Sequence, residues 1–288
     1  MWPNFFIVGA SKSGTTSLYA YLNEIPEVYM SPIKEPRYFH NFIHETYLKR
    51  IKETSKYLRL FKKVQNEKAI GEASPTYLFD PDSPKLIKKA VPHARIIIIL
   101  RDPVKRSFSH YLMHKNNGRE TESFYQVIQR GIKREKNSKY NACLDPGLYF
   151  NQVRRYFEIF GRDKVKVLIF EEFFKDPKKT IKEILDFLDV KSEILPKILK
   201  TYNVYREPTG KVAELILKSS TIDKIAVSLI PQSIRRRLKE TVTEKPKEKP
   251  IMTEMDRLSL ESFYYQDVKN LQNLLQRRLP WICANNNL

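Results

Sequence analysis

The sequence predicts an α/β protein, a three-layer P-loop-type parallel sheet flanked by helices on both faces. Short apolar runs at residues 5–8, 95–100 and 165–170 lack the alternation of half-exposed strands and are typical of parallel strands buried on both faces. Segments with helical periodicity follow these runs in turn, and this alternation favours a parallel sheet covered on both sides. A glycine-containing turn directly after the first run indicates the P-loop variant of this architecture.

The order of the elements follows from periodicity and turn signals. Strands are expected at residues 5–8, 26–30, 69–77, 95–100 and 165–170, the third of them ending in a loop. Helices are expected at residues 15–22, 47–62, 83–90, 123–134, 147–160, 176–188 and 255–279. A further helix is expected to begin at Pro103, with Asp102 as its N-cap. Two prolines within residues 31–40 predict an extended loop there.

We expect a single domain over residues 1–288. Residues 211–238 are basic and helical in pattern, and residues 243–250 alternate Lys, Glu and Pro in the manner of an exposed linker. We therefore interpret 211–250 as a basic helical excursion and linker, and 251–288 as a C-terminal helix that packs back. Three consecutive arginines at 235–237 either contact an acidic glycan or membrane surface or belong to a solvated helix face.

The turn from Gly9 to Gly14, between the first strand and the first helix, has the features of a phosphate-binding loop. Backbone N–H groups of such a loop and of the following helical turn converge on one point, where the helix dipole favours an anion. Three hydroxyl side chains follow the loop: Thr15, Thr16 and Ser17. A nucleotide triphosphatase loop carries lysine directly after its second glycine, whereas here the lysine is Lys12, inside the loop. A strand-to-helix turn without a ligand is the alternative.

A second candidate anion site follows another strand. Arg101 comes directly after residues 95–100, and its guanidinium offers a planar fork of donors suited to a phosphate. Ser109 lies two turns further along the helix expected there. Because the carboxyl ends of parallel strands gather at one edge of the sheet, a ligand with two anionic ends would explain both sites.

The charge of the chain favours anionic partners. Lys and Arg number 52 against 33 Asp and Glu, a formal net charge of +19. Such an excess fits nucleotide-like cofactors, acidic glycans, acidic lipid head groups or nucleic acid, although a solvated basic surface accounts for part of it. A nucleic-acid-binding module would cluster basic residues with interleaved aromatics, but here the charge is spread along the chain, so we expect no nucleic-acid partner.

Cysteine usage and hydropathy favour a cytoplasmic protein. The two cysteines, Cys143 and Cys283, lie far apart and show neither metal-ligand nor redox spacing. The longest strongly apolar run, residues 96–100, is far shorter than the roughly 20 residues of a membrane span, and no signal peptide is visible. Because the first strand begins within a few residues of the start, we expect no stem or anchor ahead of the domain.

Two histidine pairs have the spacing of two metal ligands on one helix. They are His40/His44 and His110/His114, each at i, i+4. No third ligand or Cys cluster accompanies either pair in the sequence, so we expect no metal site.

Taken in order, these motifs resemble the sulfotransferases that use 3′-phosphoadenosine 5′-phosphosulfate (PAPS) as donor. In that family a loop like residues 11–17 binds the 5′-phosphosulfate, and a strand followed by Arg and Ser, like residues 96–109, binds the 3′-phosphate. The resemblance implies these donor-binding residues: Lys12, Ser13, Gly14, Thr15, Thr16, Ser17, Arg101 and Ser109. It also implies PAPS as donor, adenosine 3′,5′-bisphosphate as product, and no requirement for a metal.

Other segments extend the resemblance over nearly the whole chain. Residues 34–39, Lys-Glu-Pro-Arg-Tyr-Phe, look like the Lys-Glu-x-x-Phe-Phe segment of heparan-type and bacterial carbohydrate members, whose glutamate is the general base. Residues 71–77, 147–149 and 279–281 also look like bacterial members. The ordered set is more specific than any one of these motifs.

The chemistry of sulfuryl transfer agrees with this resemblance. A compact anionic group moves from a phosphate to an acceptor oxygen, so the protein mainly positions the partners and neutralises developing charge, as in phosphoryl transfer. The resemblance implies that Lys12 stabilises the leaving phosphate oxygen and that Glu35 is the general base for a hydroxyl acceptor, a carbohydrate or glycolipid. From the residues alone, Glu35 can equally be a surface carboxylate paired with Lys34 or Arg37.

The sequence departs from the family pattern in several places. Heparan-type members carry a lysine near the position of Ala73, and its absence favours the bacterial branch. The catalytic histidine of small-molecule members is missing, and so is their C-terminal Arg-Lys-Gly-type donor loop. Residues 203–210 occupy the region of that loop, and Arg206 is a candidate for binding the 3′-phosphate. The competing prediction of a P-loop kinase would need lysine in place of Thr15 and a magnesium-binding carboxylate, for which Asp102 is poorly placed.

Overall fold

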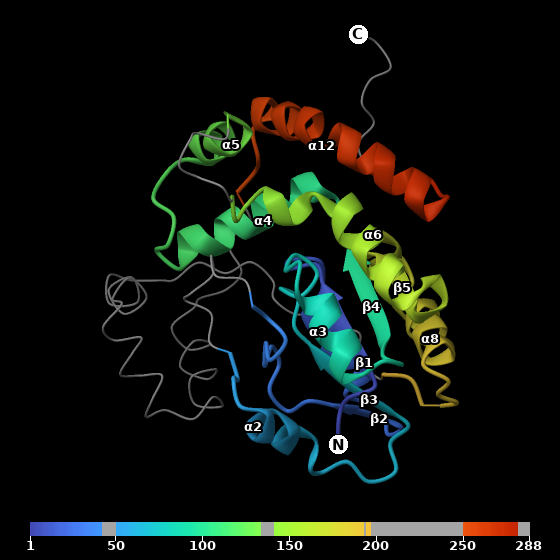
Figure 1. Ribbon diagram of the computed structural model, residues 1–288. Coiled ribbons are helices and arrows are strands. Elements are labelled where there is room, and N and C mark those ends of the chain that lie inside the picture. The colour runs from blue at the N-terminus through green and yellow to red at the C-terminus, as the bar shows by residue number, and fades with distance from the viewer. Residues whose placement is uncertain (42–49, 134–140, 193, 197–249, 282–288) are drawn as a thin grey trace.

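A five-stranded parallel sheet is the centre of the computed structural model, which describes residues 1–41, 50–133, 141–192, 194–196 and 250–281. The strand order is β2-β3-β1-β4-β5, and every neighbouring pair runs parallel (Figure 1). The strands are β1 (Phe5–Gly9), β2 (Val28–Met30), β3 (Ala69–Ala73), β4 (Arg95–Leu100) and β5 (Val165–Ile169). The predicted α/β parallel sheet is therefore confirmed.

Helices cover both faces of the sheet. They are α1 (Thr15–Leu22), α2 (Thr54–Leu58), α3 (Ser83–Ala90), α4 (Pro103–Asn116), α5 (Phe124–Lys133), α6 (Tyr149–Phe160), α7 (Phe170–Lys175), α8 (Pro177–Phe187) and α12 (Glu254–Leu275). Short 3₁₀ turns occupy Arg59–Phe61, Asp145–Gly147 and Arg162–Lys164. The helix α12 packs outside α4, α5 and α6 and forms a further layer on that side (Figure 1).

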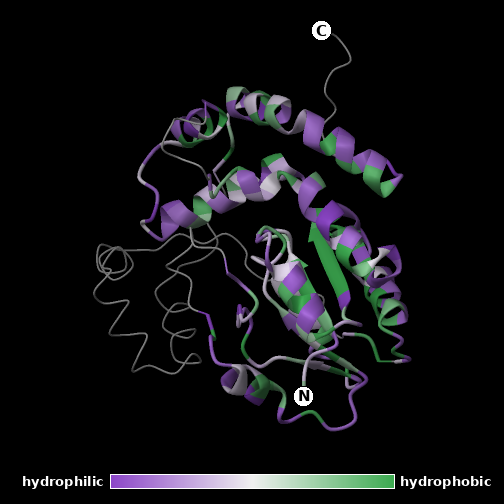
Figure 2. Ribbon diagram, in the orientation of Figure 1, coloured by the Kyte–Doolittle hydropathy of each residue, from purple (hydrophilic) through white to green (hydrophobic). Residues whose placement is uncertain are grey.

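Side chains of the central strands alternate between two hydrophobic cores. On β1, Phe6 belongs to the core shared with α3, α4, α6 and α12, whereas Phe5 and Ile7 belong to the core shared with α1 and α8. On β4, Ile96 belongs to the first of these cores and Ile97 to the second. Because both faces are buried, β1 and residues 96–100 of β4 are apolar, while the helices carry one apolar side (Figure 2).

Local chemistry explains where the helices begin. The Asp102 side chain accepts hydrogen bonds from Val104 N (2.9 Å) and Lys105 N (3.3 Å), which confirms the predicted cap of α4. Asp176 caps α8 in the same manner, through Lys179 N at 3.0 Å. In the described residues, no helix is both long and apolar enough to cross a membrane.

Two predicted helices differ from the structure. In place of the helix expected at 47–62, the structure has α2 and the following 3₁₀ turn. The helix does not begin earlier in the described residues because Ile51 N donates to Pro36 O (2.9 Å) and the backbone of Glu53 is extended. Residues 42–49 lie outside the described part. The helix expected from Gly147 begins at Tyr149, after a 3₁₀ turn. The strand expected within 69–77, ending in a loop, agrees with β3, which ends at Ala73 and is followed by a turn. The predicted basic segment 211–238 also lies outside the described residues.

Candidate active site

The carboxyl ends of neighbouring strands bring the predicted site residues to one edge of the sheet. β1 leads into the loop that holds Lys12, and β4 leads directly to Arg101. Beside β1 lies β3, and Glu35 is bonded to its last residue through Glu35 N to Ala73 O (2.9 Å). A crevice at the carboxyl edge is where open parallel sheets bind ligands. The three segments singled out from the sequence therefore meet at the expected edge.

The loop after β1 has the backbone of an anion cradle. Lys12 (φ 69°) and Gly14 (φ 88°) are both left-handed, and no side chain caps the N-terminus of α1. Such a conformation turns successive N–H groups toward one point, as in anion-binding loops, although Ser13 N donates to Ala10 O at 3.2 Å. A Cβ on Gly14 would lie 2.9 Å from the Phe174 ring and 3.1 Å from the Phe170 ring, so glycine is required for packing as well as for φ.

The hydroxyl side chains of this loop differ in exposure. Thr15 and Ser17 are buried, and Thr16 is partly exposed at the start of α1. Ser13 is fully buried; its Oγ lies beside the Tyr149 hydroxyl and has no well-formed hydrogen bond within the described residues. A buried polar atom without good partners costs stability and is a ready donor for a bound anion.

Arg101 directly contacts the backbone of the loop that follows β1. Its Nη1 donates to Lys12 O at 3.1 Å, and its guanidinium lies 4.5 Å from the centre of the Phe170 ring. Burial lowers the pKa of Arg101, and the nearby Glu171 carboxylate acts against this shift. The Nε atom of Arg101 is buried without a partner among the described residues. A stacked guanidinium with a spare donor is well suited to a phosphate.

Lys12 extends toward helix α4. Its ammonium lies 3.7 Å from the Met113 sulfur, next to the histidine pair of the same helix. The Nε2 atoms of His110 and His114 lie 3.0 Å apart, as a hydrogen-bonded pair. Burial lowers the pKa of both rings, and the positive charge of Lys12 adds to this effect, so both are neutral at pH 7. Within the described residues, no group of three His, Cys, Asp or Glu side chains could hold a metal.

Glu35 is held in a strained turn between two cations. Its φ is +64°, and that of Arg37 is +52°, both uncommon for non-glycine residues. The Glu35 carboxylate accepts hydrogen bonds from Lys34 Nζ (2.7 Å) and from Arg37. Burial alone would raise the pKa of Glu35, but the charges of Lys34 and Arg37 outweigh it and lower the pKa. The predicted pairing of Glu35 with Lys34 or Arg37 is therefore present with both, and its role as general base stays a prediction.

Other candidates are placed differently. Ser109 is partly exposed on α4, and in the described part of the chain no hydrogen bond joins it to Arg101. His40 lies in the loop before residue 42, not on a helix, with its Nδ1 3.2 Å from Asp80. The candidates His44 and Arg206, and the arginines at 235–237, lie outside the described residues.

Sequence reasoning missed two buried polar residues near this edge. Arg106 of α4 is fully buried and donates to Cys143 O and to Ser107 Oγ. Glu72 of β3 is also fully buried, and burial raises its pKa to about 8. For Glu72, one signal was a charged residue inside an otherwise buried strand, in the sequence Ala-Ile-Gly-Glu-Ala of β3, and another was its place in the segment 71–77.

Comparison with known proteins agrees with this arrangement. The sulfotransferase domain family matches residues 3–268. The chain is 37% identical over 109 residues to the membrane-associated sulfotransferase kil1 of Dictyostelium discoideum, covering 38% of this chain and 22% of that protein. It is 29% identical over 198 residues to bifunctional heparan sulfate N-deacetylase/N-sulfotransferase 4 of Mus musculus (65% and 22% covered). It is 25% identical over 250 residues to carbohydrate sulfotransferase 15 of Homo sapiens (65% and 44% covered). The chain thus spans less than half the length of each of these relatives.

Solved structures extend the similarity to almost the whole chain. A sulfotransferase from Alicyclobacillus acidocaldarius has 31% sequence identity and a TM-score of 0.72, with 97% of this chain and 98% of that chain covered. Mouse sulfotransferase SULT7A1, solved in complex with PAP, shares the fold at 16% identity and a TM-score of 0.52, with 95% and 87% covered. The resemblance inferred from the motifs is confirmed at the level of the family. The chain belongs to the sulfotransferase family of enzymes.

Proposed function

We propose that this protein transfers a sulfuryl group from PAPS to a hydroxyl group of a carbohydrate or glycolipid. The observation that carries the proposal is the hydrogen bond between Arg101 and the backbone of Lys12, because it joins the two candidate phosphate sites at one edge. A donor with a phosphosulfate at one end and a phosphate at the other needs two such sites side by side. The solved relative in complex with PAP, and the relatives named for heparan sulfate and carbohydrate, support this choice.

The residues present fit such a donor. The inward N–H groups of the loop and the buried Ser13 hydroxyl suit the 5′-phosphosulfate, as do the hydroxyls of Thr15, Thr16 and Ser17. The Nε of Arg101, which has no partner among the described residues, suits the 3′-phosphate. Ser109 on α4 is its proposed second contact, and Arg206 is a further candidate. The positive charge of the chain favours an anionic ligand in general.

In the proposed mechanism, the protein's residues stabilise the charge of the leaving group and remove one proton from the acceptor. PAPS supplies an activated sulfuryl group, whose bond to the 5′-phosphate breaks as a bond to the acceptor oxygen forms. Lys12 leaves its contact with Met113 and stabilises the negative charge on the leaving phosphate oxygen. Glu35 takes the proton of the acceptor hydroxyl. We propose that this charge compensation by Lys12 requires no metal.

The acceptor must loosen the ion pairs of Glu35. Lys34 and Arg37 lower the pKa of Glu35 and so weaken it as a base. We propose that the bound acceptor draws these two cations away, which restores the basicity of Glu35 at the moment of reaction.

One relative is named as an N-sulfotransferase, so acceptor screening includes amino sugars as well as hydroxyl sugars. The predicted cytoplasmic location stays a prediction, and one relative is named as membrane-associated.

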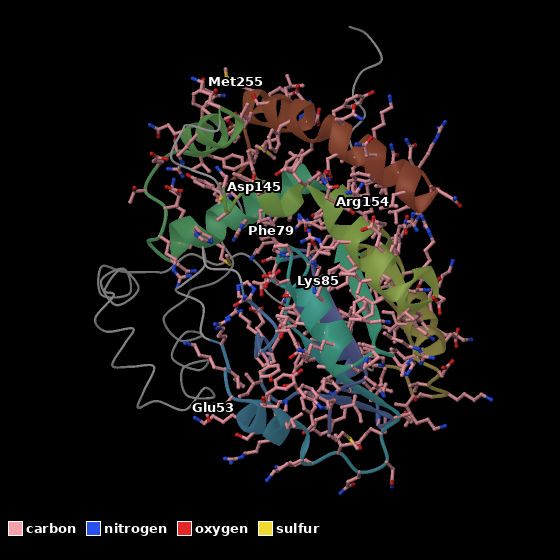
Figure 3. All side chains as sticks on the ribbon, in the orientation of Figure 1. Glu53, Phe79, Lys85, Asp145, Arg154 and Met255 are labelled. Carbon is pink, nitrogen blue, oxygen red and sulfur yellow. The ribbon has the colours of Figure 1, made fainter. Side chains whose placement is uncertain are left out.

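A melting scan with adenosine 3′,5′-bisphosphate tests the donor site. The wild type should be stabilised, and Lys12→Ala and Arg101→Ala should lose most of that shift, because a ligand that binds only the folded state raises its stability by mass action. Lys85→Ala on α3 and Arg154→Ala on α6 remove the same charges from exposed positions elsewhere and serve as controls (Figure 3). Stabilisation by ATP with magnesium or by an oligonucleotide, with none from the bisphosphate, would show that the donor assignment is wrong.

A further inference from the structure

Tyr149 connects the two halves of the candidate donor site. It is the first residue of α6 and is fully buried. Its hydroxyl donates to Arg101 O at 3.0 Å and lies beside the Ser13 side chain of the phosphate loop. One buried hydroxyl therefore contacts both segments that the donor would bridge.

Glu171 forms a second support for the same turn. Its Oε1 accepts from Asp102 N at 3.2 Å, so the carboxylate holds the peptide that follows Arg101. Its charge also stabilises the Arg101 cation against the effect of burial. Glu171 directly follows Phe170, the ring on which the Arg101 guanidinium lies. The side chain and the backbone of Arg101 are thus supported by adjacent residues of α7.

The C-terminal part of the chain holds both supports. Trp281 is buried, donates from Nε1 to the second oxygen of Glu171 at 2.8 Å, and packs its ring 6.0 Å from that of Tyr149. Asp267 of α12 accepts from Tyr149 N at 2.7 Å and from Phe150 N at 3.2 Å. The segments 147–149 and 279–281, which the phosphate sites themselves do not use, therefore converge behind Arg101.

We infer that Tyr149, Glu171 and Trp281 are positioning residues for the donor site, an inference that rests on the donor assignment proposed above. Together they hold the backbone of the 101–102 turn against the phosphate loop, so that the Arg101 guanidinium and the loop N–H groups are prearranged for one rigid ligand. Prearranged groups bind without the cost of ordering, and small displacements of such groups weaken binding strongly. The supports act through Arg101 and do not touch the acceptor.

Tyr149→Phe is the sharpest test, because the same helix offers a matched control. Tyr156 is also fully buried on α6, and its hydroxyl also donates to a backbone carbonyl, Tyr77 O at 2.9 Å, rather than to the carbonyl of Arg101. Each change removes one hydroxyl and one hydrogen bond to a carbonyl, so both variants should lose a similar amount of melting temperature. The dissociation constant for adenosine 3′,5′-bisphosphate, measured by calorimetry, should rise about three- to tenfold in Tyr149→Phe and stay within about twofold in Tyr156→Phe.

Trp281→Phe tests the support from the C-terminus. The change keeps an aromatic ring against Tyr149 but removes the hydrogen bond to Glu171, and the bisphosphate should bind more weakly as a result. Trp2→Phe is the control, since Trp2 packs in an aromatic cluster with Tyr38 and Tyr57. In turnover assays, the KM for the donor should rise in Trp281→Phe, while the KM for the acceptor stays unchanged.

The outcomes separate this inference from the donor assignment. If the wild type binds the bisphosphate and both tyrosine variants bind it equally well, or weaken equally, the positioning role is wrong and the donor site stands. If the KM values for donor and acceptor rise together in Trp281→Phe, the tryptophan supports the fold in general rather than the donor site. If the wild type does not bind the bisphosphate, the donor assignment fails and the positioning role fails with it.

Discussion

The buried carboxyl of Glu72 is the most unusual single residue near the site. It lies on β3 opposite Phe6 of β1, with no exposed surface, and the hydroxyls of Tyr57 and Tyr77 are its polar neighbours. Burial raises the pKa of Glu72 to about 8, and the hydrogen bonds from the two tyrosines offset only part of this rise. At neutral pH the residue is therefore mostly protonated, which avoids the cost of an unpaired buried charge.

Glu72→Gln should flatten the dependence of stability on pH. Between the ordinary pKa of about 4.3 and the folded value of about 8, the folded state keeps a proton that the unfolded chain has released, so wild-type stability falls as pH rises. The loss across this window is on the order of 3–5 kcal/mol, and glutamine, which has no charged form, should abolish it. Urea unfolding at several pH values between 5 and 8 measures the effect.

The control for this prediction is an exposed glutamate. Glu158 on α6 is 63% exposed beside Arg154, so Glu158→Gln should leave the pH dependence as in the wild type. Equal slopes of unfolding free energy against pH in Glu72→Gln and in the wild type would contradict the protonated state of Glu72 in the folded protein.

Among the elements, α6 is capped by a side chain of a helix that is distant in sequence. Its N-cap residue Leu148 offers no side-chain hydrogen bond, and Asp267 of α12 takes that role by accepting from Tyr149 N and Phe150 N. The first N–H groups of a helix need such acceptors, and a carboxylate there also interacts favourably with the helix dipole. These two hydrogen bonds add to the packing of the outer helix α12 on the helix that carries Tyr149.

Asp267→Ala should destabilise the protein more than removal of an ordinary cap. Asp176→Ala on α8 is the matched control, since Asp176 is exposed and caps its own helix. This variant should lose about 1 kcal/mol of unfolding free energy. Asp267→Ala removes the cap and the link to α12 together, so we expect about 2 kcal/mol or more. Asp267→Asn keeps an acceptor oxygen and should recover most of this loss. Urea unfolding of the three variants is the measurement, and equal losses in both alanine variants would contradict the linking role.

Over the whole molecule, the excess of positive charge favours the binding of anionic ligands. The net charge of +19 is spread over the chain, while Lys12 and Arg101 concentrate positive charge at the carboxyl edge, with Arg106 buried nearby. Fields of this kind attract anions over about one Debye length, which shrinks as salt is added. A multiply charged donor should therefore bind less tightly at high ionic strength.

The dissociation constant for adenosine 3′,5′-bisphosphate should rise about tenfold between about 50 and 500 mM sodium chloride. Adenosine, which lacks the phosphates, is the control ligand and should show little dependence on salt. Calorimetric titration at several salt concentrations measures both. A bisphosphate affinity that does not change with salt would contradict electrostatic attraction as a main contribution to binding.

Much of this arrangement could be predicted because its signals are local. The apolar run of β1, the turn from Gly9 to Gly14 and the cap at Asp102 each depend on residues within a few positions of one another. Parallel topology then places Lys12 and Arg101 at one edge without further information. The helix expected at 47–62 failed for the opposite reason, since Ile51 N is bonded to Pro36 O in a different segment and leaves the helical pattern.

By itself, the sequence determined the fold class, because strand periodicity and glycine turns are properties of neighbouring residues. The order of its motifs along the chain indicated the family and predicted a phosphate loop. Only the tertiary structure decided how the site is held: Arg101 against Phe170, Tyr149 against Arg101 O, and Glu171 between Asp102 and Trp281. These contacts join residues up to 110 positions apart, and their hydrogen bonds form only where the packing of α6, α7 and α12 excludes water and fixes distances.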